Sequence, residues 1–264
     1  MIDKKRLEIL YDQYNHTKFI YPDPVAFLHQ AWDDSDREIV AFIASSLAYG
    51  NVSQILKSIA SVLKEMAPSP AQFLRRSSKE LLISTFSGFK HRFTTGRELA
   101  LILFGIKCIV EQYGDLQACL VRHIDEDGEP TLSVLSVFSE RILSASGVAQ
   151  STLVPIPSKG SACKRLNLFM RWMVRQDNID PGGWDCISAS KLIVPLDIHM
   201  HRICHALGFT RRKQADMRTA LEITNAFRSV VPEDPVRYDF ALTRLGIRED
   251  GDLEGFLREY DCKD

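Results

Sequence analysis

The chain has 264 residues, of which 45% are hydrophobic and 25% charged, an ordinary composition for a globular protein with a substantial core. Its formal net charge of −1 excludes a protein that is polycationic overall. No segment reaches the roughly 18 apolar residues of a membrane span, and the N-terminus has no apolar run of signal-peptide length. We therefore expect a cytoplasmic protein that has no membrane partner.

The six cysteines are scattered along the chain without a C-x-x-C pair. This spacing is typical of reduced structural thiols and supplies no zinc or iron–sulfur ligand set. His201 and His205 have the i, i+4 spacing of a metal pair, but the sequence offers no identifiable third ligand. We interpret His199 as a local hydrogen-bonding residue. We accordingly expect neither a metal nor a cofactor.

Helical periodicity recurs along the chain, and Pro, Gly, Ser and Asp clusters separate the periodic segments. We predict helices near residues 3–15, 35–48, 51–66, 70–76, 94–113, 131–145, 162–176, 199–207, 215–230 and 235–245. No alternating run is long enough to predict a dependable strand. The sequence therefore predicts an all-α fold.

The distribution of charge is uneven. Residues 141–176 contain no acid, whereas acids concentrate at 125–129 and after Glu249. The basic residues of the acid-free segment are Arg141, Lys159, Lys164, Arg165, Arg171 and Arg175. Such a segment is compatible with a local site for a polyanion. A solvated helix face explains the same pattern.

The acid-free segment combines a turn with an amphipathic helix. Its apolar positions run i, i+3, i+4, i+7, i+8 and are Leu166, Phe169, Met170, Met173 and Val174. Lys164, Arg171 and Arg175 fall on the opposite side, so we predict that Lys164 points away from the core. A Pro-x-x-Gly turn ending at Gly160 precedes the helix. Free amides beside Gly160 and Ser161 make this turn a natural phosphate site.

The stretch VPLDIHMHRICHALGF, residues 194–209, places an aspartate in front of another amphipathic helix. The apolar positions of that helix are Met200, Ile203, Cys204 and Leu207. Asp197 therefore stands at or near the helix N-terminus, where a carboxylate accepts backbone amides and suits the helix dipole. A helix cap alone explains the residue, so a further role needs support from the rest of the chain.

The segment PLDIHMHRICHALGF resembles the VDTHVxRVxxRLG signature of the helix–hairpin–helix DNA glycosylases, the superfamily that includes endonuclease III. Three other stretches, 41–66, PIPSKGSACKRLNL and 220–247, are similar to this superfamily in matching order. The chain also resembles an uncharacterised bacterial family with KGSACKRLNLF-type and PLDxHxHR-type motifs. The resemblance covers roughly residues 35–250 and implies a single unit, 1–264, of two helical lobes with a cleft between them.

The resemblance also implies roles for particular residues. Asp197 matches the aspartate that stabilises the positive charge developing on the sugar as the base leaves. Lys164 matches best the lysine that forms a Schiff base in lyase-competent members, and Lys159, inside the turn, is its rival. Either lysine alternatively only binds phosphate. We predict DNA contacts from Lys159, Gly160, Ser161 and Arg165.

Several residues depart from the superfamily pattern. Lys164 comes four residues after Gly160 and 33 before Asp197, a spacing that looks like the archaeal 8-oxoguanine glycosylase branch. Ser158 replaces the first hairpin glycine, and Ile198 replaces the threonine after the aspartate. The iron–sulfur cluster of endonuclease III has no ligands here.

We therefore expect a monomeric DNA glycosylase in base excision repair, associated with the nucleoid. It would flip a damaged base, by resemblance 8-oxoguanine, from double-stranded DNA, with AP lyase activity left open. Asn51 and Trp184 are candidates for lining the base pocket, Trp184 because it stands in a polar loop, whereas Trp172 flanks the core stripe. The alternatives are a non-catalytic DNA-structure binder that keeps the hairpin, and a helical protein with no nucleic-acid role.

Overall fold

The computed structural model describes residues 3–122, 132–247 and 252–261. The acidic stretch 125–129 and Cys262 lie outside these residues. The first part contains α1 (Lys4–Tyr14), η1 (Thr17–Phe19), η2 (Pro24–His29), α2 (Asp34–Ser46), α3 (Val52–Glu65), α4 (Pro70–Arg76), α5 (Lys79–Thr85), β1 (Lys90–His91), β2 (Thr94–Thr95), α6 (Gly96–Tyr113) and α7 (Leu116–Val121). The rest contains α8 (Leu132–Ser146), η3 (Pro157–Lys159), α9 (Lys164–Val174), η4 (Ala189–Lys191), α10 (Ile198–Ala206), α11 (Met217–Arg228), α12 (Asp239–Ile247) and α13 (Leu253–Asp261).

The all-α prediction is confirmed, and each of the ten predicted helices is present within a few residues of its expected bounds. The structure adds three helices, α5, α7 and α13, and one small antiparallel hairpin. In the hairpin, Lys90 pairs with Thr95 and His91 with Thr94. Strands of two residues are too short to show the alternation of apolar and polar residues that predicts a strand.

Capping residues fix where many of the helices begin. A side-chain oxygen in front of the first turn accepts a backbone amide that the helix itself leaves unpaired. The residues that do so include Asp33, Asn51, Ser69, Ser78, Thr95, Asp115, Asp197 and Asp216. Local sequence therefore sets the start of these helices, including α3 and α10, which carry candidate site residues.

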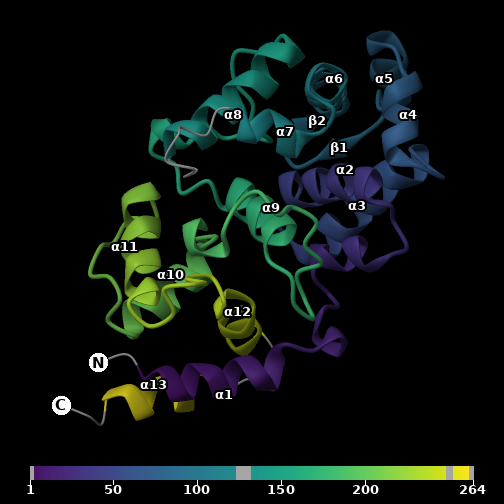
Figure 1. Cartoon of the computed structure of the whole chain (residues 1–264). Helices are drawn as coiled ribbons and strands as arrows, with labels where there is room; N and C mark the ends of the chain where they lie inside the picture. Colours follow the sequence, from purple (N-terminus) through teal and green to yellow (C-terminus); the bar gives the residue numbers. More distant parts are fainter. Residues whose placement is uncertain (1–2, 123–131, 248–251, 262–264) are drawn as a thin grey trace.

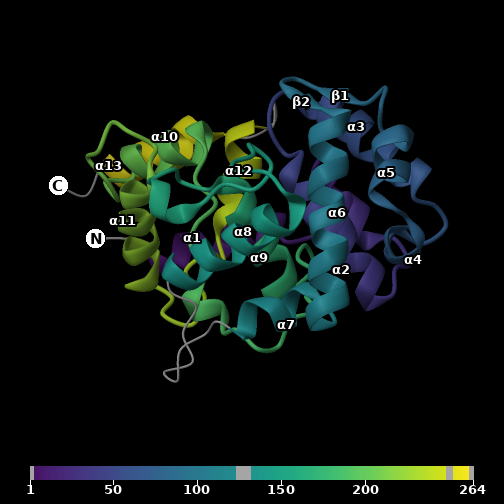
Figure 2. The ribbon, with the colours of Figure 1, turned by 90° about the horizontal axis from the view of Figure 1, so that it is seen from above.

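Helix α9 lies at the centre of the molecule. Figure 1 shows it between α2 and α3 on one side and α10, α11 and α12 on the other. Viewed from above, α2–α6 gather on one side of the molecule and α10–α13 on the other (Figure 2). The first turn of α9 therefore stands where the two groups of helices meet.

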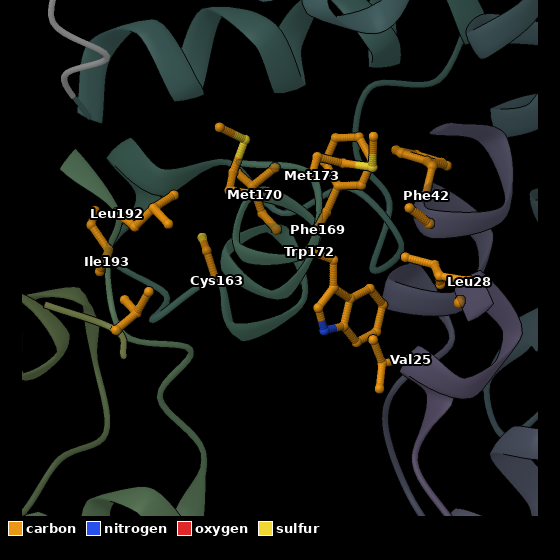
Figure 3. Close-up of a cluster of buried hydrophobic side chains, with 14 of the residues drawn as sticks. Val25, Leu28, Phe42, Cys163, Phe169, Met170, Trp172, Met173, Leu192 and Ile193 are labelled. Carbon is orange, nitrogen blue, oxygen red and sulfur yellow. The ribbon is translucent and has the colours of Figure 1, made fainter. Parts of the chain in front are cut away.

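The buried face of α9 explains its central position. Phe169, Met170, Trp172 and Met173 are each at most 3% exposed. Figure 3 shows these side chains among Val25 and Leu28 of η2, Phe42 of α2, and Leu192 and Ile193. Each buried side chain of this size contributes roughly 1.5–3 kcal/mol by leaving water, so packing holds α9 firmly between the two groups.

No helix in the described ranges is both long and apolar enough to cross a membrane.

Candidate functional site

A cavity of about 830 Å³ opens where the two groups of helices meet. Its walls come from residues 22–24, the turn from Ala48 to Val52 with Ile55 of α3, the face of α9 from Lys164 to Trp172, residues 195–199 and helix α12. Lys164, Asp197 and Asn51 are among the residues that line it. The cavity thus brings together segments separated by more than half of the chain.

Lys164 and Asp197 lie side by side on the wall of this cavity. The Lys164 ammonium lies 3.0 Å from the Asp197 carboxylate, Nζ to Oδ2. The lysine side chain is 33% exposed and the aspartate side chain 23% exposed. The structure therefore places the two sequence-predicted residues in one site, as a half-buried ion pair that a ligand entering the cavity can reach.

Asp197 is also the cap of α10, as the sequence predicts. Its Oδ1 accepts the Met200 amide at 2.9 Å, while Oδ2 faces Lys164. Burial raises the pKa of this carboxyl, but the Lys164 ammonium and the Met200 amide outweigh it and hold the pKa below its ordinary value. Asp197 is therefore an anion fixed in one orientation at the cavity wall.

The start of α9 determines where Lys164 points. Cys163, immediately before the helix, is buried and adopts the left-handed conformation at φ 48°. The buried side-chain amide of Asn167 donates to the Ala162 carbonyl at 3.1 Å. This hydrogen bond connects the residues before the helix to its first turn. Lys164 is the first residue of the helix and lies off its apolar stripe, as predicted.

A second carboxylate, Asp239 of α12, lines the same cavity but is only 5% exposed. Burial raises the pKa of Asp239 to about 6; the Arg171 guanidinium opposes the shift and the Asp197 charge adds to it. The two carboxyl groups thus have pKa values displaced in opposite directions. Asp197 is therefore the carboxylate that a ligand in the cavity can reach, whereas Asp239 is held by Arg171 inside the protein.

Both explanations of the acid-free segment 141–176, a polyanion site and a solvated helix face, are wrong for two of its arginines. Arg171 and Arg175 are 3% and 6% exposed. Arg171 pairs with Asp180 and Asp239, whereas Arg175 pairs with Asp177, Asp180 and Asp234. The acidic partners of both arginines lie outside the acid-free segment, so the sequence around the arginines does not show that their charges are neutralised inside the protein.

The predicted phosphate turn is only partly available. Lys159, Gly160 and Ser161 are exposed, but the Gly160 amide donates to the Pro157 carbonyl at 3.0 Å. This amide is therefore not free to bind phosphate, because the turn closes on itself as the short helix η3. Arg165 points elsewhere: its Nη1 donates to the Ser46 carbonyl at 3.1 Å and its guanidinium lies 4.6 Å from the centre of the Tyr49 ring.

The two residues predicted to line a base pocket have different positions. Asn51 lines the cavity, and its side chain caps α3 by accepting the Ser53 amide at 3.0 Å. The expectation of an exposed Trp184 is wrong, because this residue is 5% exposed. Its indole packs edge-on against Phe169 and donates to the Glu38 carboxylate at 3.0 Å. Trp172 is buried, as the core interpretation predicts.

The described residues contain no group of three or more His, Cys, Asp or Glu side chains placed to hold a metal ion. The His201 ring instead lies within hydrogen-bonding distance of the Arg212 carbonyl, at 2.8 Å. His199 lines the cavity two residues after Asp197. The i, i+4 histidine spacing therefore has a local structural explanation.

Residues 23–248 match the model of a family described as "Protein of unknown function (DUF2400)". The chain belongs to this family. The matched range includes Lys164, Asp197 and every residue that lines the cavity except Pro22. Comparisons with curated proteins and with solved structures gave no match. These comparisons show no link to the helix–hairpin–helix glycosylases, so that relationship rests on the motifs alone.

Three charged residues of the cavity of this DUF2400 protein were not anticipated from its sequence: Asp23, Asp239 and Arg244. Arg244 is 5% exposed and pairs with Asp23, which fastens α12 to the segment before η2. A signal for Asp239 existed, because it opens an apolar helix directly after Tyr238. Nothing local distinguishes Asp23 from a turn residue in YPDP.

Proposed function

We propose that this protein is a DNA N-glycosylase of base excision repair that removes a damaged base from double-stranded DNA. The observation that carries this proposal is the Lys164–Asp197 pair, 3.0 Å apart on the wall of an 830 Å³ cavity. A stacked duplex hides the glycosidic carbon, so the enzyme must flip the target nucleotide into such a pocket. A cavity of several hundred Å³ has the size of small-molecule sites in general.

The two side chains divide the chemistry between them. The Lys164 ammonium gives one proton to water, and the amine attacks C1′ of the sugar. The Nζ–C1′ bond forms, the glycosidic bond breaks, and its electron pair leaves with the base, which takes up a proton from water. Asp197 stabilises the positive charge that develops on the sugar. The Met200 amide and the helix start hold this carboxylate in place before the substrate arrives, which lowers the cost of organising the site.

The resemblance narrows the proposal further. Lys164 and Asp197 are 33 residues apart in the sequence, as in the archaeal 8-oxoguanine glycosylase branch, which favours 8-oxoguanine as the base that is removed. The C1′–O4′ bond of the sugar then breaks, O4′ takes up a proton, and an imine forms at Lys164. Loss of a C2′ proton to water expels the 3′ phosphate by β-elimination, which makes the enzyme an AP lyase as well. Lys159 is a weaker candidate for the nucleophile, because it is exposed on η3 and is not among the residues that line the cavity.

The test is incubation of the full chain with duplexes that each carry one lesion, with and without borohydride. We expect base excision and a covalent adduct trapped by reduction. Lys164→Gln should abolish the adduct, whereas Lys159→Gln, the matched control in the neighbouring turn, should retain it. Excision without any adduct restricts the proposal to a monofunctional glycosylase. DNA binding with no excision of any lesion contradicts it and favours a non-catalytic binder in which Asp197 is only a cap.

A further inference from the structure

The hairpin formed by β1 and β2 presents two large side chains to solvent beside the cavity. His91 and Thr94 are buried, whereas Phe93, between them, is 66% exposed and Arg92 is also exposed. Figure 2 shows the hairpin next to α3, the helix whose start contributes to the cavity wall. An exposed ring by itself is common on protein surfaces, so the interest of Phe93 depends on the groups around it.

Hydrogen bonds hold the tip in place. The Tyr49 hydroxyl donates to the His91 carbonyl at 2.9 Å and lies 2.7 Å from the Thr94 hydroxyl. One His91 ring nitrogen lies 3.0 Å from the Tyr49 carbonyl and the other 2.9 Å from the Ser58 hydroxyl. The tip is therefore fixed to the turn that lines the cavity and does not need to be ordered when a partner binds.

On this surface two stacked aromatic rings lie between two guanidinium groups. Phe93 stacks on Tyr49, with ring centres 5.7 Å apart and planes 15° from parallel. The Arg92 guanidinium lies 5.2 Å from the Phe93 ring centre, and that of Arg165 lies 4.6 Å from the Tyr49 ring centre. Arg92 also packs over Gly50, a residue of the cavity wall.

The charged residues of the hairpin itself are basic, whereas Glu98, in the first turn of α6, acts on Arg165. Residues 81–97 contain no acidic residue, but they contain three basic ones, Lys90, Arg92 and Arg97. Aromatic faces combined with basic side chains are the features by which proteins hold single nucleic-acid strands, because bases stack on the rings and phosphates pair with the cations. Further apolar side chains, Tyr21 (73% exposed) and Ile198 (79% exposed), adjoin lining residues of the cavity.

We propose that the Arg92–Phe93 tip, with Tyr49 and Arg165 behind it, is the surface that contacts the DNA strand whose base enters the cavity. A base next to the flipped nucleotide stacks on Phe93, and Arg92 binds an adjoining phosphate. This inference rests on the proposed function, since it assumes that a nucleic-acid strand reaches the cavity.

The test measures binding of the full chain to a labelled duplex that carries a tetrahydrofuran abasic analogue, at low salt. Phe93→Ala should weaken binding about tenfold, as expected for the loss of one stacked base. Ile9→Ala is the matched control, since Ile9 is 59% exposed on α1 and is not among the residues that line the cavity. Arg92→Gln should lower the slope of log affinity against log salt by about one, whereas Lys64→Gln, at the far end of α3, should not.

Unchanged binding by Phe93→Ala, or an equal loss in Ile9→Ala, overturns the inference. Excision by the wild-type protein on lesion duplexes is measured separately. If the wild type excises a base while the Phe93 and Arg92 variants behave like it, the inference fails and the proposed function stands. If the wild type excises nothing but Phe93→Ala weakens binding, the tip is a nucleic-acid surface and the glycosylase proposal fails.

Discussion

The two ends of α9 place cations of the same helix face in opposite environments. Lys164, in the first turn, is 33% exposed in its side chain and pairs with one carboxylate of the cavity. Arg171, two turns later, is 4% exposed in its side chain and pairs with two carboxylates, those of Asp180 and Asp239. Helix geometry puts both residues on nearly the same side of α9. Tertiary packing alone therefore separates their roles.

This difference shows which of the charges are free to do chemistry. A buried cation with several hydrogen-bonded partners is held by its surroundings, and removing it leaves uncompensated charges inside the protein. A half-exposed ion pair contributes little to stability, so a substrate can replace either partner at low cost. The start of α9 is therefore suited to binding and reaction. The second half of the helix, which carries Arg171, is suited to holding the helices together.

The largest expected effect concerns Arg171. Replacing it by methionine leaves the buried Asp239 carboxylate without its paired cation and leaves Asp180 with Arg175 alone, so Arg171→Met should lower the free energy of unfolding by about 3–5 kcal/mol. The same change at the other end, Lys164→Met, should cost less than about 1 kcal/mol. Urea unfolding of both variants at pH 7 measures the contrast. Equal losses in the two variants would contradict the division between a structural and a reactive end.

Local features of the site were predictable from the sequence. Asp197 was recognisable as a cap because the apolar spacing of α10 starts directly after it, and a cap depends on the next three residues only. The direction of Lys164 followed from its angle to the stripe of α9. Both inferences need no information from distant parts of the chain.

Features that depend on distant partners were not predictable. The partners of Arg171 lie at positions 180 and 239, so its burial does not show in the segment around it. Trp184 stands in a polar loop, yet the buried Glu38, 146 residues earlier, accepts its indole hydrogen. The hairpin that carries Phe93 has strands of two residues, which leave no periodic signal.

The second prediction sharpens the contrast by testing whether the reactive end carries the chemistry. Asp197→Asn removes the charge that opposes the developing oxocarbenium ion and should reduce excision by about 100-fold or more. DNA affinity should hardly change, because asparagine caps a helix about as well as aspartate. Single-turnover excision and equilibrium binding on the same lesion duplex measure the two quantities.

Asp33→Asn is the matched control for this prediction. Asp33 caps α2 by accepting the Asp36 amide at 2.7 Å, as Asp197 caps α10, but it is not among the residues that line the cavity. Its replacement should leave excision unchanged. Full excision by Asp197→Asn would assign Asp197 the role of a cap alone.

The smallest expected effect is the contribution of the Lys164–Asp197 ion pair to stability. The pKa of Asp197 lies below its ordinary value, since Lys164 and the Met200 amide outweigh the effect of burial. The stabilisation from this shift is complete above the unfolded pKa of about 3.9 and is lost as pH falls through the lower folded pKa. Asp197→Asn keeps the cap but lacks the charge, so at pH 7 it should be less stable by at most about 1 kcal/mol.

The pH dependence of that small gap separates the ion pair from the cap. Once the wild-type carboxyl is protonated, both proteins carry a neutral cap, so the gap should narrow as pH falls below about 4. Urea unfolding of the wild type and Asp197→Asn at pH 7 and pH 3 measures it. A gap that stays constant would mean that the Asp197 charge contributes nothing to the folded state. The 3.0 Å contact between Lys164 and Asp197 would then not persist in solution. The start of α9 would then not carry the ion pair that distinguishes it from the rest of the helix.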